Sequence, residues 1–300
     1  MGSRHLRTNQ DHTVTPTEKR RRFRALLAGS GCVHPADVFD PLSARMAEDL
    51  GFECGMFAGS VASMVVLGAP DIVLITLTEF AEQVRRICRA TDLPLMCDAD
   101  HGYGNALNVR RTVEELETAG ICAITIEDTL LPASYGESAG KGLVSIEEGI
   151  GKMHAARAAR RDPALVIAGR TSALALSTVE DTIARMKAYE ATGVDVIFLA
   201  GAKTRAQVDA VYQAIKIPLL LGGVGGELMD KAYLASRGVR ICLLGQNAYL
   251  ASLQAINETY KALRGGAKPS QLANLAPSDL VRRITRASEY EHDAKAFLGK

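Results

Sequence analysis

From residue 32 onward, short apolar runs alternate with stretches that have the hydrophobic spacing of amphipathic helices. Eight runs have the length and apolar character of buried strands, at residues 32–39, 54–59, 93–100, 122–128, 164–170, 195–201, 217–223 and 240–245. Helices are predicted between them, among others at Leu107–Ala119, Ile146–Arg160, Val179–Thr192, Arg205–Ala214 and Leu228–Ser236. Continuously apolar strands, each followed by a helix, are typical of a parallel sheet with both faces covered.

Several predicted helices end in the same way, with a glycine that is followed at once by a strand: "ETAGICAI", "EATGVDVI" and "ASRGVRIC". Glycine at this position readily takes the left-handed conformation that caps a helix. Repeated strand–helix units predict a (β/α)₈ TIM-type barrel over residues 17–263, and an open doubly wound sheet is the alternative. In a barrel, polar residues at the carboxyl ends of the strands should line one common mouth.

The two ends of the chain depart from this pattern. Residues 1–16 form a polar tail without the apolar core of a signal peptide. The stretch "RGGAKPSQ" interrupts the pattern after Leu263, and a helix is predicted again over Leu280–Phe297. Residues 264–300 are therefore predicted to be a linker and an appended helix that packs on the barrel or on a neighbouring subunit.

Composition narrows the class of protein. The 300 residues carry a net charge of +1 and no Trp, which gives no general attraction for nucleic acid or an acidic membrane. No apolar run reaches the ~18 residues that a membrane span needs. The six cysteines include no Cys-x-x-Cys pair, so we expect free thiols in a reducing compartment. These features favour a cytoplasmic enzyme.

Candidate chemistry appears where the third predicted strand ends, in "MCDADHGYGN" at residues 96–105. Asp98 and Asp100 are two apart, so they share a face if the strand continues, and Glu127 ends the next predicted strand. Because neighbouring strands lie ~5 Å apart, the three carboxylates can converge on one ion. Oxygen ligands without a His or Cys cluster favour Mg²⁺ or Mn²⁺ over zinc. The alternative is a set of exposed loop carboxylates or helix caps.

Two further strand ends offer groups suited to an anion. Arg170 ends the fifth predicted strand with a fork of donors that matches a carboxylate, although a salt bridge to a neighbouring strand-end carboxylate is the alternative. Gly59 and Ser60 follow the second strand, where backbone N–H groups and a hydroxyl can hold another anionic oxygen. Gly-Ser is also an ordinary turn.

Taken together, "DADHGYGN", "ITIEDTLLP", "GSVAS", "APD" and "GRT" give the chain a family likeness. Over roughly residues 20–263 the sequence resembles the phosphoenolpyruvate mutase/isocitrate lyase superfamily, and within it the oxaloacetate decarboxylase branch. The resemblance implies a Mg²⁺-bound α-keto-acid site in a (β/α)₈ barrel. It also implies a homotetramer, a dimer of dimers, in which subunits exchange the last barrel helix.

The same resemblance implies a role for each candidate residue. Asp98 would bind the metal, and Asp100 and Glu127 would hold it directly or through its waters. The substrate carboxylate would contact Ser60, the adjacent backbone and Arg170. Asp71 would lie near the active-site mouth, with a solvated loop residue as the alternative, and His101 would have a supporting or structural role.

Some positions depart from the family pattern. The segment "LLPASYGESAGKGLVS" has neither Cys nor His, which argues against chemistry by a thiolate there. Gln246 stands where the decarboxylase branch tends to carry a His, and Ser172 replaces an amide. The segment "LLGGVGGE" lacks an expected polar turn. These changes fall around the substrate and not around the metal.

The predicted function is decarboxylation of a small α-keto dicarboxylic acid, oxaloacetate, to pyruvate and CO₂ through a metal-stabilised enolate. Neutral Gln246 would orient the C4 end of the substrate. One alternative is another enzyme on the same metal site, either a C–C lyase for a substituted malate or a phosphonopyruvate-type enzyme. The other is a non-catalytic, metal-dependent keto-acid binding protein.

Overall fold

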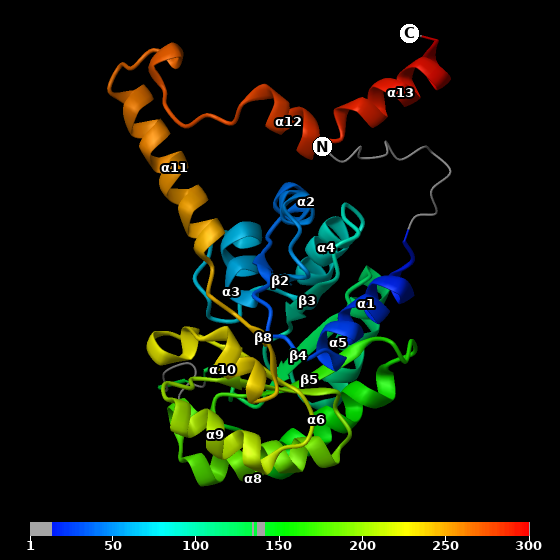
Figure 1. Ribbon diagram of the computed structural model, residues 1–300, viewed down its shortest axis with the longest axis vertical. Coiled ribbons are helices and arrows are strands. Elements are labelled where there is room, and N and C mark those ends of the chain that lie inside the picture. The colour runs from blue at the N-terminus through cyan, green and yellow to red at the C-terminus, as the bar shows by residue number, and fades with distance from the viewer. Residues whose placement is uncertain (1–13, 134, 137–141, 300) are drawn as a thin grey trace.

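The computed structural model describes residues 14–133, 135–136 and 142–299. Within them, eight parallel strands form one sheet, and each strand pairs with the next along the chain (Figure 1). The strands are β1 (Ala36–Asp37), β2 (Gly55–Phe57), β3 (Leu95–Asp98), β4 (Ala123–Glu127), β5 (Val166–Thr171), β6 (Val196–Ala200), β7 (Leu219–Gly222) and β8 (Val239–Cys242). Each strand overlaps one predicted apolar run, so the prediction of eight strands is confirmed.

The sheet closes through Val33, just before β1. The N–H of Val33 donates to the carbonyl of Arg240 at 2.9 Å, and the N–H of Cys242 donates to the carbonyl of Val33 at 2.9 Å. These bonds form a parallel bridge between Val33 and Ile241. The predicted (β/α)₈ barrel is therefore confirmed, and the alternative of an open sheet is wrong.

Most of the helices cover the barrel, and the C-terminal ones lead away from it (Figure 1). The larger ones are α1 (Pro16–Ala28), α2 (Pro41–Leu50), α4 (Leu77–Cys88), α5 (Ala106–Ala119), α6 (Ile146–Ala159), α8 (Val179–Ala191), α9 (Arg205–Ala214), α11 (Asn247–Arg264) and α13 (Ala287–Leu298). The short ones are α3 (Gly59–Ala62), α7 (Ala173–Leu176), α10 (Lys231–Ser236) and α12 (Ser278–Ile284). The predicted glycine caps are left-handed, with φ of 99° at Gly120, 81° at Gly193 and 70° at Gly238.

Two predicted helices are interrupted. The stretch predicted over 228–236 begins as a 3₁₀ turn, Gly226–Met229, and α10 starts after Asp230, whose side chain accepts from the N–H of Tyr233. The C-terminal helix is split into α12 and α13 at Arg286, whose φ is 59°. Arg286 donates to Asp49 of α2 at 3.0 Å, so an ion pair with the barrel helps to fix the break.

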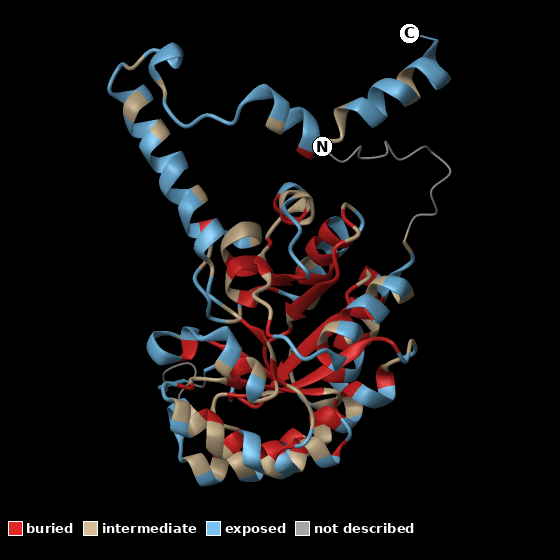
Figure 2. Cartoon of the chain, viewed as in Figure 1, coloured by how far each residue is buried: buried red, intermediate tan, exposed pale blue. Residues whose placement is uncertain are grey.

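The N-terminal helix packs against one end of the barrel core. Its capping box, Thr15 with Glu18, starts α1 at Pro16; the predicted tail at 1–16 lies mostly outside the described residues. Phe23 is fully buried and, with Leu27, packs against side chains inside the barrel such as Met56 and Phe198. A second, larger apolar layer fills the space between the strands and the helices. Buried residues therefore concentrate in the strands (Figure 2).

The C-terminal helices are the exception to this burial. α11 leads away from the barrel and is exposed along most of its length, as are α12 and α13 (Figures 1 and 2). In the part of the chain that the structure describes, no helix combines the length and apolarity needed to cross a membrane. All six cysteines are buried and free, as expected from the sequence.

Candidate active site at the barrel mouth

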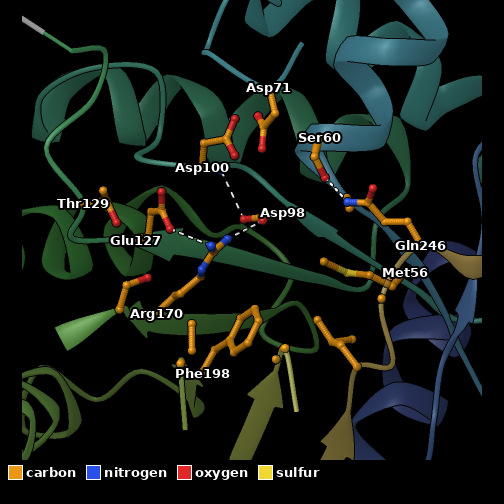
Figure 3. A pocket seen from close by; sticks show the side chains of 18 of the residues that line it. Met56, Ser60, Asp71, Asp98, Asp100, Glu127, Thr129, Arg170, Phe198 and Gln246 are labelled. Carbon is orange, nitrogen blue, oxygen red and sulfur yellow. Dashed lines mark hydrogen bonds and ion pairs between the residues drawn. The ribbon is translucent and has the colours of Figure 1, made fainter. Parts of the chain in front are cut away.

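A pocket of about 600 Å³ lies where the carboxyl ends of the strands meet. This is the end of a (β/α)₈ barrel at which active sites form. Its lining includes seven of the predicted site residues, namely Ser60, Asp71, Asp98, Asp100, Glu127, Arg170 and Gln246 (Figure 3). The structure therefore brings together side chains that are up to 186 residues apart in the chain.

Asp98 and Asp100 reach this pocket for a reason different from the one that the sequence suggested. Strand β3 ends at Asp98, and Asp100 lies in the following turn with φ of 47°. Gly102, Tyr103 and Gly104 also have positive φ, at 80°, 61° and 144°. A non-glycine residue in the left-handed region is strained, and such strain concentrates at functional sites. A strained turn, and not strand alternation, directs Asp100 into the pocket.

Gly59 lies behind Asp100. A Cβ built on Gly59 would be 2.6 Å from a carboxylate oxygen of Asp100, so only glycine leaves room for that carboxylate. Gly59 is not among the described residues that line the pocket. The structure thus brings its neighbour Ser60 to the predicted substrate site, while Gly59 makes space for a predicted metal ligand.

Arg170 lies between two of the predicted metal ligands (Figure 3). One guanidinium nitrogen donates to Asp98, and the other is 2.9 Å from Glu127, the residue paired with Arg170 in the β4–β5 register. The guanidinium also lies 5.2 Å from the ring centroid of Phe198. The salt bridge that was the alternative reading of Arg170 is therefore present.

Burial raises the pKa values of several carboxylates of the pocket, and neighbouring carboxylates add to the effect. Burial, only partly opposed by Arg170, raises the pKa of Glu127 to about 7. Burial and the neighbouring charges of Asp98 and Glu127 raise the pKa of Asp100 well above its ordinary value. Burial and the charge of Asp98 also raise the pKa of Asp71. The pocket is thus short of positive charge.

The donor set fits a divalent cation by charge and by chemistry. The described lining has five carboxylates and one guanidinium, from Asp37, Asp71, Asp98, Asp100, Glu127 and Arg170. These are hard oxygen donors, and the lining includes no His or Cys among the described residues. As placed, however, no three acidic, His or Cys side chains in the described ranges form a ready ligand cluster. A cation would have to compete with Arg170 for Asp98 and Glu127.

Two neutral side chains meet at another part of the pocket. The amide of Gln246, the residue that precedes α11, donates to the hydroxyl of Ser60, which lies in α3 beyond β2 (Figure 3). His101 lies outside the lining; it is buried, and its carbonyl accepts from Lys152 at 3.0 Å. Burial, with a smaller contribution from the charge of Lys152, lowers the pKa of His101 to about 4.

Sequence reasoning missed part of the lining. Asp37 on β1 belongs to it, and its carboxylate accepts from the N–H of Tyr249 at 3.3 Å. A strand-end carboxylate in "PADVF" was the available signal, but that run is only weakly strand-like. Met56 and Phe198 give the pocket an apolar side. Nothing in their apolar runs distinguishes them from ordinary core residues.

The raised pKa of Glu127 predicts how stability depends on pH in metal-free protein. Between about pH 4.5, the ordinary value, and about pH 7, the folded protein holds a proton that the unfolded chain has released. The free energy of unfolding should therefore fall as the pH rises through this window. Urea unfolding with a chelator present measures this slope. Glu127→Gln removes this titration and should make the slope shallower, while Asp100 and Asp71, whose pKa values are also raised, still contribute to it. Equal slopes in both proteins would contradict the prediction.

A family model described as phosphoenolpyruvate phosphomutase matches residues 23–264. A curated relative from Bradyrhizobium diazoefficiens, named "Oxaloacetate decarboxylase", is 55% identical over 281 residues, covering 94% of this chain and 97% of that protein.

Solved structures agree with the family match. The phosphoenolpyruvate phosphomutase of Streptomyces platensis subsp. rosaceus has a TM-score of 0.83 at 28% identity, over 93% of this chain and 99% of that one. A phosphonopyruvate hydrolase solved in complex with oxalate and Mg²⁺ has a TM-score of 0.82 at 29% identity, over 94% and 99%. The likeness extends along almost the whole length of each chain.

Proposed function

The chain belongs to the phosphoenolpyruvate phosphomutase family, and on this premise we propose that it decarboxylates oxaloacetate to pyruvate and CO₂ with the help of a divalent cation, Mg²⁺ or Mn²⁺. The name of its curated relative supports the reaction. The observation that carries the proposal is one pocket in which, among the described residues of its lining, carboxylates outnumber the single guanidinium.

Three of these carboxylates are the proposed ligands of the cation. Asp98, Asp100 and Glu127 are held at the ends of adjacent strands, and their mutual repulsion favours a cation among them. When bound, a divalent cation acts as a Lewis acid and stabilises negative charge that develops on the keto acid. Thr125 supports Asp98 through a hydrogen bond of 2.9 Å from its hydroxyl.

The distribution of charge in the pocket suits the loss of a carboxylate. Oxaloacetate has two carboxylates, whereas Arg170, the cationic side chain in the described lining, is already paired with Asp98 and Glu127. In the reaction the C3–C4 bond breaks, its electron pair moves toward the C2 oxygen, and a proton is added at C3. Neutral Gln246 can orient the C4 carboxylate while stabilising its charge less than a cationic side chain would, so that CO₂ leaves more readily.

Other chemistry on the same site finds less support. A phosphonate substrate would need more positive charge than Arg170 supplies. Acid–base work by a thiol is also disfavoured, because none of the six buried cysteines is among the described residues of the lining. Burial raises the pKa of Cys242 to about 12 and of Cys32 to about 11, which leaves these thiols protonated.

The proposal predicts a Mg²⁺-dependent loss of oxaloacetate, followed by its absorbance, that stops when the metal is chelated. Gln246→Ala should lower kcat/KM about tenfold, the worth of roughly one hydrogen bond. Substituted malates and phosphonopyruvate, tested under the same conditions, should react more slowly. Loss of oxaloacetate no faster than with Mg²⁺ alone would contradict the proposal, and tight oxalate binding without turnover would instead identify a binding protein.

We also propose a cytoplasmic homotetramer whose subunits exchange α11. Support comes from one face of α11, where apolar side chains are 40–68% exposed, namely Leu250, Leu253, Ile256, Tyr260 and Leu263. Exposed apolar side chains in a row do not stabilise a monomer, whereas a partner subunit would bury them. The free cysteines support a reducing compartment. The mass in solution, measured by light scattering, should be that of four chains.

A further inference from the structure

Behind the candidate active site, a second polar cluster is buried between the barrel and the helices α6 and α8. Its members are Asp128, Thr171, Arg185 and Tyr189, none more than 8% exposed. None of them is among the residues that line the pocket. Asp128 directly follows Glu127, and Thr171 directly follows Arg170. Two members of the cluster are therefore the sequence neighbours of Glu127 and Arg170, the ion pair in the pocket (the inner ion pair).

Three donors converge on one oxygen of Asp128. The hydroxyl of Thr171 donates at 2.9 Å, the hydroxyl of Tyr189 at 2.8 Å, and the guanidinium of Arg185 at 3.2 Å. The other carboxylate oxygen has no hydrogen-bond partner within the described residues. Hydrogen bonds to a charged acceptor are stronger than those between neutral groups, so this oxygen is firmly held.

The cluster lies opposite the inner ion pair on the same two strand ends. Successive side chains alternate across a strand, so Asp128 and Thr171 point toward the helices where Glu127 and Arg170 point into the barrel. Glu127 and Arg170 are register partners, and the N–H of Asp128 donates to the carbonyl of Arg170 at 3.3 Å. The hydrogen bond between Asp128 and Thr171 thus ties together the same strand ends that carry Glu127 and Arg170.

The same cluster also fixes the start of α6. The N–H of Val144 donates to the carbonyl of Asp128 at 2.8 Å, and Arg185 donates to the carbonyl of Val144 at 2.8 Å. On α6, a Cβ built on Gly149 would be 2.3 Å from the hydroxyl of Tyr189, so glycine at this position admits the tyrosine. Asp128 therefore joins β4 to β5 and α8 through its carboxylate, and to the segment just before α6 through its backbone carbonyl.

We propose that Asp128 is a positioning residue, which acts with Thr171, Arg185 and Tyr189 to hold Glu127 and Arg170 in the arrangement that cation and substrate binding require. The inference rests on the proposed function for the identity of the ligands. A buried ionic cluster contributes little net stability, because desolvation offsets the attraction between the charges. Groups that orient metal ligands, in contrast, typically change affinity or activity 10- to 100-fold when they are removed.

Asp128→Asn and Thr171→Val test the inference, with Asp195→Asn as a matched control. Asp195 accepts from Arg24 at 2.9 Å, from Arg160 at 2.7 Å and from the N–H of Ile167 at 2.8 Å, so it is a similar acceptor just before β6 and outside the pocket lining. Each variant is measured by urea unfolding, by calorimetry of oxalate binding with MgCl₂, and by oxaloacetate turnover.

Asp128→Asn and Asp195→Asn should both unfold at lower urea concentration. Asp128→Asn alone should weaken Mg²⁺-dependent oxalate binding and lower kcat, each by about 10- to 100-fold. Thr171→Val keeps the shape of the side chain and should change both quantities in the same direction by less, which keeps the test valid if Asp128→Asn does not fold.

The inference would be overturned if Asp128→Asn and Thr171→Val both kept the oxalate affinity and kcat of the wild-type protein. If only Thr171→Val folds, unchanged values in that variant would overturn it. The cluster would then have a structural role only. Failure of the proposed function would look different. In that case the wild-type protein would not consume oxaloacetate, whereas oxalate binding would still distinguish Asp128→Asn and Thr171→Val from Asp195→Asn.

Discussion

Asp98→Asn is expected to lower oxaloacetate turnover at saturating Mg²⁺ by about 10³-fold. Lewis-acid stabilisation by a metal is worth several kcal/mol, and about 4 kcal/mol corresponds to that factor. The amide keeps the size of the side chain and can still accept from Thr125. It removes the charge that faces Arg170 and the proposed cation. Steady-state kinetics over a range of Mg²⁺ concentrations measure the effect.

Asp37→Asn is the matched control for that substitution. Asp37 is another carboxylate of the same pocket, but it lies on β1 and accepts from the backbone of Tyr249. Turnover of this variant should stay within about tenfold of the wild-type value, since at most one hydrogen bond is weakened. Equal losses in the two variants would mean that general pocket charge matters and that Asp98 has no special role.

Arg170→Ala is expected to destabilise the metal-free protein by about 3–5 kcal/mol. Removing one partner of a buried ion pair leaves uncompensated charge, here on both Asp98 and Glu127. A divalent cation supplies the missing positive charge. The difference in the free energy of unfolding between Arg170→Ala and the wild-type protein should therefore become smaller as MgCl₂ is added. Urea unfolding with chelator and with MgCl₂ measures both quantities.

Arg24→Ala separates this metal effect from a general loss of partly buried ion-pair and hydrogen-bond contacts. Arg24 donates to Asp195 and to the carbonyls of Ala164 and Leu165, away from the pocket. Its loss should destabilise the protein equally with and without MgCl₂. If Arg170→Ala behaves in the same way, a cation does not share the carboxylates that Arg170 contacts. Arg170→Lys should regain part of the stability, because it restores charge without the fork of donors.

The predicted strands and most of the predicted helices agree with the structure because their signals are local. Apolar runs, helical spacing and glycine caps depend on neighbours a few residues away. The exceptions have different causes. The C-terminal helix breaks at Arg286, which pairs with Asp49, and Asp37 was missed because β1 has only two residues. Asp100 was placed in the pocket for the wrong reason, since a strained turn carries it there.

The sequence by itself determined that this chain forms a (β/α)₈ barrel and that its strand-end acids gather at one mouth, because the carboxyl ends of parallel strands meet on one side of a sheet. Only the tertiary structure decided which charges face each other. Arg170 meets Asp98 across 72 residues of chain, and Asp128 meets Tyr189 across 61. Such pairs depend on strand register and helix packing, which cannot be predicted from any short stretch of the sequence.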